Sequence, residues 1–526
     1  MLAFTLLLLG VQADIPVNCN YRQVLGSWTL HIDQATFTAS PLNPQSSCGH
    51  GQPDTVDPVR PGESWQFQQE TVEAVTLSLP DIVESEAWGT GQWTMIANEG
   101  FLLQFPTSTF FAFSKYSSDS DDQQYSECDQ TMLGWHSPAD PQNHSDWSCF
   151  YAVKDTPEAR TAFKTGSVRW VSPTSFLQSA GMYEDQEGLV HRLNEVQSEW
   201  TAGFSDYFKG MSLLEVNRRV GTQRSASKPD FSNMQKYPAF LERQPGTVVD
   251  VDRLGRTDPE SIRAFLTTPL DDIPIDPLPS HWDWSNVGGQ TFTPARGPMD
   301  QGNCGSCFAI AAMEMLEARL ALQTSDSDIR LSLQYLISCG FYTEGCNGGF
   351  PTLALKFIAE FGIPAETCMK YSPGDNEPHC STMCDPNDSD LWVTVDSYGY
   401  LGGYYGAGSE DLMMKELRAR GPFAVSFEPG NTFAYYTKGI FSDQVLREDD
   451  EMTMRDTDTA WEQVDHSVLL VGWGEERGVK YWKLMNSWGP NWGENGFFRV
   501  RRGVDDSSIA SMPEVAIPRI LDQPLI

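Results

Sequence analysis

The chain has 526 residues, of which 40% are hydrophobic and 12% aromatic, so it is long enough for two to four globular domains. Its 71 acidic residues against 36 basic ones give a formal net charge of −35, which argues against nucleic acid or an anionic membrane as the partner. The charge is most simply that of an acidic, solvated surface. A protein that works in an acidic compartment is the more specific alternative, and composition alone does not exclude it.

The N-terminus has the pattern of a secretory signal. An apolar run over residues 2–10 is followed by the small-residue cleavage pattern VQA at 11–13. The run is too short to span a bilayer, which takes about 20 apolar residues. We therefore predict a signal peptide over residues 1–13, cleaved after Ala13, and a mature protein in the secretory pathway without a membrane span.

The cysteine count predicts one thiol outside the disulfides. In an oxidising compartment the eleven cysteines should pair, and an odd number leaves one over. If the four before residue 150 and the seven after residue 300 pair within each group, the groups hold two and three bridges. A zinc site at Cys304 and Cys307 would need a second ligand pair with suitable spacing, which is absent, so no metal is predicted.

Residues 14–155 read as a β-rich unit. Short apolar and β-branched runs alternate with Gly, Pro, Asn and Asp, which is typical of strands and turns. The predicted strands are residues 28–32, 71–79, 92–97 and 110–113. The stretch "SSDSDDQQYSECD" at 117–129 is predicted to be an exposed acidic loop.

Residues 156–277 contain no cysteine and read as a removable segment. Helical periodicity runs over 189–208, and a polar, proline-rich stretch with five prolines covers 256–280. Such a composition is linker-like and accessible to proteases. We therefore predict a segment that is cut before the next domain.

From residue 278 the chain reads as globular again. Residues 307–322 are rich in Ala, Leu, Met and Glu and predict a helix. Residues 466–474 and 479–489 are apolar, β-branched and aromatic and predict two strands, preceded by an acidic surface loop at 447–465. The sequence has no GxGxxG, P-loop or HExxH motif.

Cys307 is the first residue of the predicted helix, and this position favours a reactive thiol. A helix N-terminus carries a partial positive charge that stabilises thiolate over thiol. A thiolate nucleophile needs a histidine partner, and among the eight histidines the candidate is His466, which begins the strand-like apolar run at 466–474. At the end of the next strand, the Asn486 amide could orient that imidazole, and Trp488 could shield the bond from water. Gln301 could donate to an oxyanion.

These motifs resemble a known family. Residues 301–308, 464–474 and 486–496 resemble the three signature regions of papain-like cysteine peptidases. Phe308 stands where the family's motif has Trp or Tyr, and the acidic loop lengthens the spacing to the histidine. The resemblance implies an α+β, two-lobed peptidase domain over 278–526. Its helical lobe would cover about 278–400 and its β lobe about 401–526, with an acidic loop at 443–465.

Further motifs resemble the cathepsin C type of that family. They include "DIPVNCNYRQVLGSW", "ECDQTMLGW" and "WSCF" before residue 155, and "GCNGGFP" and "GYLGGYYG" after residue 278. The resemblance implies that residues 14–155 form an antiparallel, barrel-like exclusion domain that blocks one end of the cleft. It also implies a zymogen that matures into an exopeptidase releasing N-terminal dipeptides from peptides and proteins. An activating protease would cut the zymogen within 156–277. A further cut, which divides the peptidase domain into two chains in relatives, would fall in the loop before the histidine, with Arg447 and Arg455 as candidate points. A homo-tetramer is a feature of the family.

The resemblance also assigns roles to single residues. Asp14, the first residue after the predicted cleavage, would bind the α-amino group of the substrate. The wall of the pocket for the substrate side chain would be Gly348, Gly349 and Phe350. Asp465 precedes the histidine where relatives commonly have Asn, and its negative charge would stabilise the imidazolium or alter substrate preference. No cofactor is required, but chloride is possible, because Tyr400 matches one of two tyrosine positions of the family's chloride site. Thr352 occupies the other.

The remaining implications concern covalent features and location. Two N-glycosylation sequons begin at Asn143 and Asn387. The implied compartment is a lysosome or lysosome-like acidic vesicle, or secretion. The implied disulfide pairs, which leave Cys307 over, are Cys19–Cys128, Cys48–Cys149, Cys304–Cys346, Cys339–Cys380 and Cys368–Cys384.

Two alternative functions remain open at this point. One is a papain-like endopeptidase whose N-terminal unit is only a removable pro-region. The other is a non-catalytic binding protein of the same fold. The presence of Gln301, Cys307, His466 and Asn486 together argues against the second.

Overall fold

The computed structural model covers both predicted globular parts and a piece of the segment between them. It describes residues 17, 19–50, 67, 69–118, 124–158, 161–162, 182–213, 216, 278–289, 291–294, 296–372, 380, 389, 391–428, 431–442, 466–510, 512–521 and 524–525. The predicted signal peptide, Asp14, Cys384, Asn387, both arginines of the predicted cleavage points and the acidic loop at 443–465 lie outside these residues.

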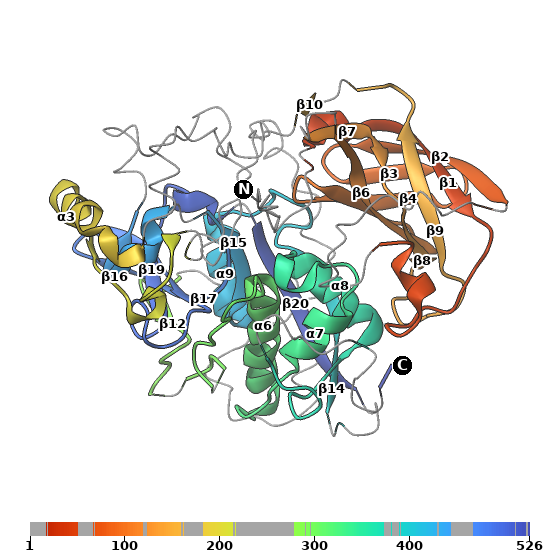
Figure 1. Cartoon of the computed structure of the whole chain (residues 1–526). Coiled ribbons are helices and arrows are strands. Elements are labelled where there is room, and N and C mark those ends of the chain that lie inside the picture. Colours follow the sequence, from red (N-terminus) through yellow and green to blue (C-terminus); the bar gives the residue numbers. More distant parts are fainter. Residues whose placement is uncertain are drawn as a thin grey trace, which may run out of the picture.

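The N-terminal part is an antiparallel β-barrel (Figure 1). The barrel closes because β1 pairs with β2 on one side and with β9 on the other. Along β1, Trp28, Leu30 and Ile32 point into the core, as the alternation of apolar residues predicts. The strands are β1 (Gly26–Asp33), β2 (Glu70–Ser78), β3 (Ile82–Ser85), β4 (Gly89–Ile96), β5 (Gly100–Gln104), β6 (Ser108–Ser118), β7 (Gln124–Thr131), β8 (Gly134–Pro138), β9 (Ser148–Lys154) and β10 (Thr161–Ala162), with α1 (Tyr21–Val24) and η1 (Pro44–Ser47) beside them.

The prediction of an acidic loop over 117–129 is wrong for the residues at both ends of this stretch, which are the ones that the structure describes. Residues 117–118 belong to β6, and 124–129 belong to β7, which pairs with β6 in an antiparallel register. Cys128 on β7 is buried in a disulfide bond with Cys19. Ladder pairing and the disulfide therefore override the polar local composition.

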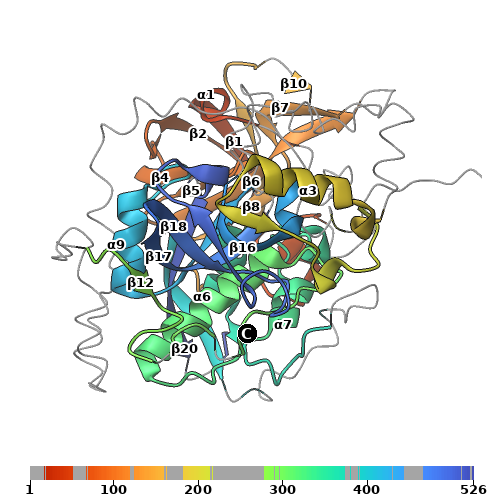
Figure 2. The ribbon, with the colours of Figure 1, turned by 90° about the vertical axis from the view of Figure 1, so that its left-hand side faces the viewer.

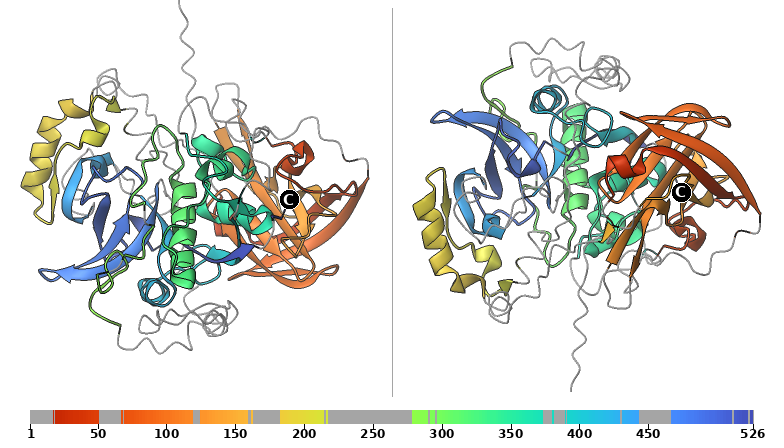
Figure 3. Two further views of the ribbon diagram at one scale, coloured as in Figure 1. Left: turned by 90° about the horizontal axis from the view of Figure 1, so that it is seen from below. Right: turned by 90° about the horizontal axis from the view of Figure 1, so that it is seen from above.

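In its described residues, the C-terminal part combines four helices with a second, mixed sheet, and the predicted α+β class is confirmed. The long helix α6 runs between the sheet and the helices α7 and α8 (Figures 1 and 3). The helices are α6 (Cys307–Thr324), α7 (Leu333–Cys339), α8 (Pro351–Phe361) and α9 (Glu410–Arg420), with short turns η7 (Gly345–Asn347), η10 (Asn431–Tyr435) and η13 (Asp506–Ser508). The strands are β12 (Trp282–Asp283), β13 (Ile363–Pro364), β14 (Trp392–Tyr400), β15 (Phe423–Phe427), β16 (Tyr436–Phe441), β17 (His466–Glu476), β18 (Val479–Met485), β19 (Phe497–Arg501) and β20 (Met512–Leu521).

Helix α6 is the buried centre of this part. It begins at Cys307 and ends at Thr324, two residues beyond the predicted end, and nearly all of its side chains are buried. Its Arg319 donates to the carbonyl oxygens of Pro422 and Ala516 and pairs with Glu416. The helix is therefore tied to β15, β20 and α9 as well as packed against them.

Among the described residues, no helix combines the length and apolarity that a membrane crossing would need.

Part of the segment predicted to be removable is folded against the β lobe. Residues 182–208 form η2 (Tyr183–Asp185), α3 (Glu187–Val196), β11 (Trp200–Ala202) and η3 (Asp206–Phe208). They cover the outer end of the second sheet in Figure 2. The helix predicted over 189–208 is wrong beyond residue 196, because β11 pairs with β16 and extends the sheet. The Gln197 side chain bonds both the N–H and the C=O of Trp200 and turns the chain into that strand.

The barrel packs on α8 and on the turns beside it (Figure 3). The Trp135 ring lies 4.9 Å from the Tyr342 ring, measured between centroids. Polar contacts reinforce this packing, since His144 Nε2 lies 2.6 Å from the carbonyl oxygen of Glu360. The backbone N–H of Tyr405 donates to Thr94 Oγ1 at 2.9 Å. The barrel is thus fixed to the lobe that carries the predicted pocket wall.

Replacing Trp135 by Ala should destabilise the protein strongly. This ring is 1% exposed and packs against Phe111 in the barrel and against Phe341 and Tyr342 outside it. Truncation should lower the free energy of unfolding by about 3–5 kcal/mol, measured by chemical denaturation. Leu42→Ala, at a side chain that is 60% exposed, is the matched control and should change it little. Equal effects of the two variants would contradict this packing.

Candidate active site

Cys307 occupies the first position of α6, where the helix N-terminus meets a glycine-rich turn. The N-cap is Ser306, and the preceding Cys304 is bonded to Cys346. Cys307 itself is in none of the disulfide bonds and its side chain is partly exposed. The unsatisfied N–H groups and the dipole of an 18-residue helix therefore act on this thiol and favour its thiolate form.

His466 is the first residue of β17, and its ring is held by Asn486. Its Nε2 lies 2.7 Å from Asn486 Oδ1, which also accepts the backbone N–H of Ser487 at 2.8 Å. Because this amide oxygen can only accept, His466 Nε2 carries a proton and donates it. Nδ1 is then the basic nitrogen of the neutral ring, and it is buried with no hydrogen-bond partner within the described part of the chain. It is the atom available to a thiol.

Trp488 covers the histidine–asparagine bond. Its ring stacks on the imidazole with centroids 4.9 Å apart and is fully buried, as is Asn486. Burial lowers the pKa of His466 from 6.5 to about 4, and the bond to Asn486 acts in the opposite direction. With the site as folded in this structure, the His466 imidazole is therefore neutral above about pH 4. A thiolate next to the ring would be needed to keep the imidazole protonated.

Gln301 is fixed by hydrogen bonds at both ends of its amide. The Ser487 hydroxyl donates to Gln301 Oε1 at 2.6 Å, and Gln301 Nε2 donates to the carbonyl oxygen of Cys304 at 3.0 Å. The backbone N–H of Gln301 also donates to the Ser487 carbonyl at 2.9 Å. The side-chain N–H₂ therefore faces the turn before the nucleophile, where a substrate oxyanion would form.

Two residues of this network were not predicted. Ser487 orients Gln301, and the Tyr371 hydroxyl donates to the Gln301 carbonyl at 2.7 Å and bonds the Ser306 hydroxyl at 2.8 Å. Ser487 directly follows Asn486, so its place in the motif could have drawn attention to it. Tyr371 reaches the site from a distant loop, and no local pattern marks it.

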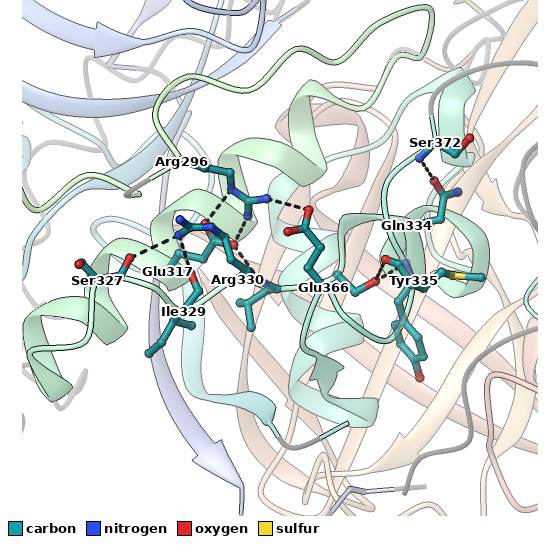
Figure 4. Close-up of polar contacts among 12 residues, drawn as sticks. Arg296, Glu317, Ser327, Ile329, Arg330, Gln334, Tyr335, Glu366 and Ser372 are labelled. Atoms are coloured by element: carbon teal, nitrogen blue, oxygen red, sulfur yellow. Dashed lines mark hydrogen bonds and ion pairs between the residues drawn. The ribbon is translucent and has the colours of Figure 1, made fainter. Parts of the chain in front are cut away.

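A second layer of contacts supports the two loops that carry this network (Figure 4). Arg296, which precedes Gln301, pairs with Glu317 on α6 and with Glu366. The backbone N–H of Ser372, next to Tyr371, donates to Gln334 Oε1 at 2.9 Å. The loop positions therefore depend on α6 and α7.

The predicted pocket wall lies beside the nucleophile. Gly348 and Gly349 follow η7, and Phe350 is the N-cap of α8. A Cβ on Gly349 would lie 2.9 Å from the ring of Phe308, the residue after the nucleophile, so only glycine fits there. The aromatic ring at position 308 thus packs directly under the wall.

Tyr400 ends β14 behind this wall. It is buried, its hydroxyl oxygen accepts the backbone N–H of Ala97 from the barrel at 3.3 Å, and Thr352 of α8 lies next to it. The two positions of the implied chloride site are therefore neighbours. Among the described residues, no group of three or more His, Cys, Asp or Glu side chains could hold a metal ion.

Four of the disulfide pairs implied by the resemblance are present. They are Cys19–Cys128, Cys48–Cys149, Cys304–Cys346 and Cys339–Cys380. Cys368 is also disulfide-bonded, but Cys384 lies outside the described residues, as do Asp14, Asp465 and Asn387. Asn143 lies exposed on the barrel, between β8 and β9.

Comparison with known proteins agrees with this geometry. Residues 278–517 match the model of the papain family of cysteine proteases, and residues 14–154 match that of the cathepsin C exclusion domain. The chain belongs to the papain family of cysteine proteases. Cathepsin C of Schistosoma mansoni is 29% identical over 95% of this chain and 94% of its own length.

Two further relatives match this chain over different shares of its length. A cathepsin B-like protein, CP2 of Giardia intestinalis, is 33% identical over 64% of this chain and 95% of its own length. Dipeptidyl aminopeptidase 1 of Plasmodium falciparum (isolate 3D7) is 26% identical over 48% of this chain and 46% of its own length. The chain spans less than half of that last relative.

Removing the Asn486 amide should impair catalysis and shift its pH dependence. Asn486→Ala leaves His466 Nε2 without its acceptor, which should lower kcat/KM roughly 10- to 100-fold. Because the bond favours the charged imidazole, its loss lowers the pKa of His466 further, and the alkaline limb of the rate profile should move to lower pH. The measurement is kcat/KM against pH for the activated enzyme. Asn491→Ala, at an exposed position of the same loop, should leave the profile unchanged, and an unshifted limb in Asn486→Ala would contradict the assignment.

Proposed function

We propose that this protein is a cysteine dipeptidyl peptidase, made as a zymogen, that removes dipeptides from the N-termini of peptides and proteins. The observation that supports this most directly is the barrel. It matches the cathepsin C exclusion domain and packs on the lobe that carries the pocket wall of a papain-type thiol site. The same site without the barrel would suit an endopeptidase.

The chemistry follows from the side chains in place. The Cys307 thiol gives its proton to His466 Nδ1, and the thiolate attacks the carbonyl carbon of the second peptide bond of the substrate. The Gln301 side-chain N–H₂ donates to the developing oxyanion. His466 then passes the proton to the leaving amine, and the acyl group stays on sulfur. Water, deprotonated by His466, attacks the thioester, and the dipeptide leaves as the thiol is restored.

The barrel limits this chemistry to the end of a chain. A barrel at one end of the cleft leaves room for only two substrate residues beyond the cleaved bond. The substrate ammonium that enters this closed end needs a counter-charge, and we assign that role to the Asp14 carboxylate. Asp465, next to the histidine, would add negative charge near the imidazole.

The folded part of the 156–277 segment would keep the zymogen inactive. Tyr183 stacks on Tyr435 with ring centroids 4.8 Å apart, and Glu199 pairs with Arg501. Phe208 packs edge-on against Trp488, the ring that covers the histidine. An activating protease would release this segment, and cuts at Arg447 and Arg455 would divide the mature chain.

Further features extend the proposal. The buried disulfides fit folding in an oxidising compartment, and we propose delivery to a lysosome-like vesicle or secretion, with N-glycans at Asn143 and Asn387. No cofactor takes part in the reaction as proposed. We also propose that chloride binds beside Tyr400 and Thr352 and that the mature enzyme assembles as a homo-tetramer.

A pair of substrates tests the exopeptidase assignment. We would compare two fluorogenic dipeptide amides that differ only in acetylation of the α-amine, using protein activated under reducing, mildly acidic conditions. Only the free-amine substrate should be cleaved, because the acetylated one lacks the ammonium and is too long for the closed end. The measurement is kcat/KM for each substrate.

Variants of the chain test which residues carry out the cleavage and which bind the free amine of the substrate. Cys307→Ala should abolish cleavage, and Asp14→Ala should reduce cleavage of the free-amine substrate selectively. If the acetylated substrate is cleaved as well as the free one, the cleft is open and the protein is an endopeptidase. If neither is cleaved and a thiol-reactive epoxide does not label Cys307, the protein is a non-catalytic member of the family.

A further inference from the structure

Tyr371 joins the residue before the nucleophile to the residue that carries the oxyanion donor. Its hydroxyl lies 2.7 Å from the carbonyl oxygen of Gln301 and 2.8 Å from the hydroxyl of Ser306. A carbonyl oxygen can only accept, so the tyrosine hydroxyl donates to Gln301, and the Ser306 hydroxyl donates to the tyrosine oxygen. The three groups therefore form one directed chain of hydrogen bonds, from the N-cap of α6 to the backbone of Gln301.

Ser306 does not cap its own helix. A serine at this position usually accepts an N–H of the first turn with its side chain. Ser332 and Ser409, the N-caps of α7 and α9, both do so. The Ser306 side chain makes no such bond, because its hydroxyl is directed at Tyr371. Its oxygen therefore does not take up the N–H groups whose partial charge acts on the Cys307 thiol.

The backbone that carries Tyr371 is held on both sides. Two residues before it, the Met369 carbonyl accepts the Ser332 hydroxyl at 2.7 Å. One residue after it, the Ser372 N–H donates to Gln334 Oε1 at 2.9 Å (Figure 4). Ser332 and Gln334 are both 0% exposed. Buried hydrogen bonds to the start of α7 thus fix the place from which the tyrosine reaches the site.

The tyrosine contact holds Gln301 at its backbone and from the helical lobe. The contacts of Gln301 with Ser487 come from the β lobe, and one side-chain N–H is used by the Cys304 carbonyl. An amide N–H₂ has two hydrogens, so the second can serve an oxyanion. Because Tyr371 binds the carbonyl and not the side chain, it fixes the residue without using that second hydrogen.

We propose that Tyr371 is a positioning residue that holds the Gln301 donor at a fixed distance from the Cys307 sulfur. The inference rests on the thiol chemistry of the proposed function and adds a residue to it. A preorganised donor must lie within reach before the oxyanion forms, and a misplacement of about 1 Å can cost about 100-fold in rate. The chain from Ser306 to Gln301 would supply this fixed geometry, and Tyr371 would act through both residues rather than on the substrate.

Removal of a single oxygen atom tests this role. Tyr371→Phe keeps the ring and breaks the chain, so it should lower kcat roughly 10-fold and change KM less than about 3-fold. A dipeptide aldehyde reports on the same geometry, because the Cys307 thiolate adds to its carbonyl carbon and the carbonyl electron pair moves to oxygen. The Ki of this inhibitor should rise by the factor by which kcat falls.

Alkylation by iodoacetamide separates positioning from a general loss of thiol reactivity. The Cys307 thiolate displaces iodide from carbon and no oxyanion forms, so the rate depends on the thiolate but not on Gln301. Tyr371→Phe should therefore leave the alkylation rate within about 2-fold of the wild-type rate across the pH range. An alkylation rate that falls as far as kcat overturns the proposal, and so does an unchanged kcat.

Two further variants serve as controls. Ser306→Ala removes the other end of the chain and should lower kcat less than Tyr371→Phe does. The double variant should be no worse than Tyr371→Phe alone, since groups in one network are not additive, and additive losses would contradict a single chain. Tyr151→Phe removes the hydroxyl of a half-buried tyrosine on β9 and should leave all readouts unchanged. If Tyr371→Phe does not fold, Ser306→Ala decides, because a wild-type kcat in that variant overturns the chain.

This proposal and the proposed function fail differently. If the acetylated substrate is cleaved as fast as the free one, the exopeptidase assignment fails, and the comparison of Tyr371→Phe with wild type is made on that substrate. If only the free-amine substrate is cleaved and Tyr371→Phe changes no readout, the dipeptidyl activity stands and the role of Tyr371 is rejected. A wild-type protein that cleaves neither substrate rejects both.

Discussion

The site depends first on the burial of α6 between the two lobes of the peptidase domain. Cys307 is on this helix, whereas His466 begins β17 and Asn486 directly follows β18, so these groups meet only if helix and sheet hold one another in place. Apolar packing along nearly the whole helix fixes their distance, and Arg319 joins the helix to β15, β20 and α9 by hydrogen bonds and an ion pair. The nucleophile and the histidine are therefore positioned by rigid elements, which is what preorganised catalysis requires.

Three parts of the chain act on this one site from different sides. The β lobe supplies the histidine under the Trp488 ring, the barrel packs against the helical lobe near the pocket wall, and residues 182–208 extend the β lobe and reach Trp488 through Phe208. The parts packed on a common protease core thus change which substrates can reach its reacting groups. The barrel would restrict substrate length, and the folded segment would restrict access, while the reacting groups stay the same.

The sequence predicts what local patterns determine. The helix starting at Cys307, the strand starting at His466 and the asparagine after the next strand are set by composition and periodicity, and the structure has each of them. It did not predict β11 or the strand character of 124–129, because both depend on partner strands far away in the chain. Tyr371 was missed for a related reason. An isolated tyrosine shows no role until the fold places its neighbours around it.

The barrel should turn the protease core into an enzyme that removes two residues at a time from a free N-terminus. The direct measurement is a time course on an unblocked peptide of about ten residues, with the products identified by mass spectrometry. We expect successive release of dipeptides from the N-terminus, and no products from the same peptide when its α-amine is acetylated. Cleavage at internal bonds at early times, equally fast in the acetylated peptide, would contradict it.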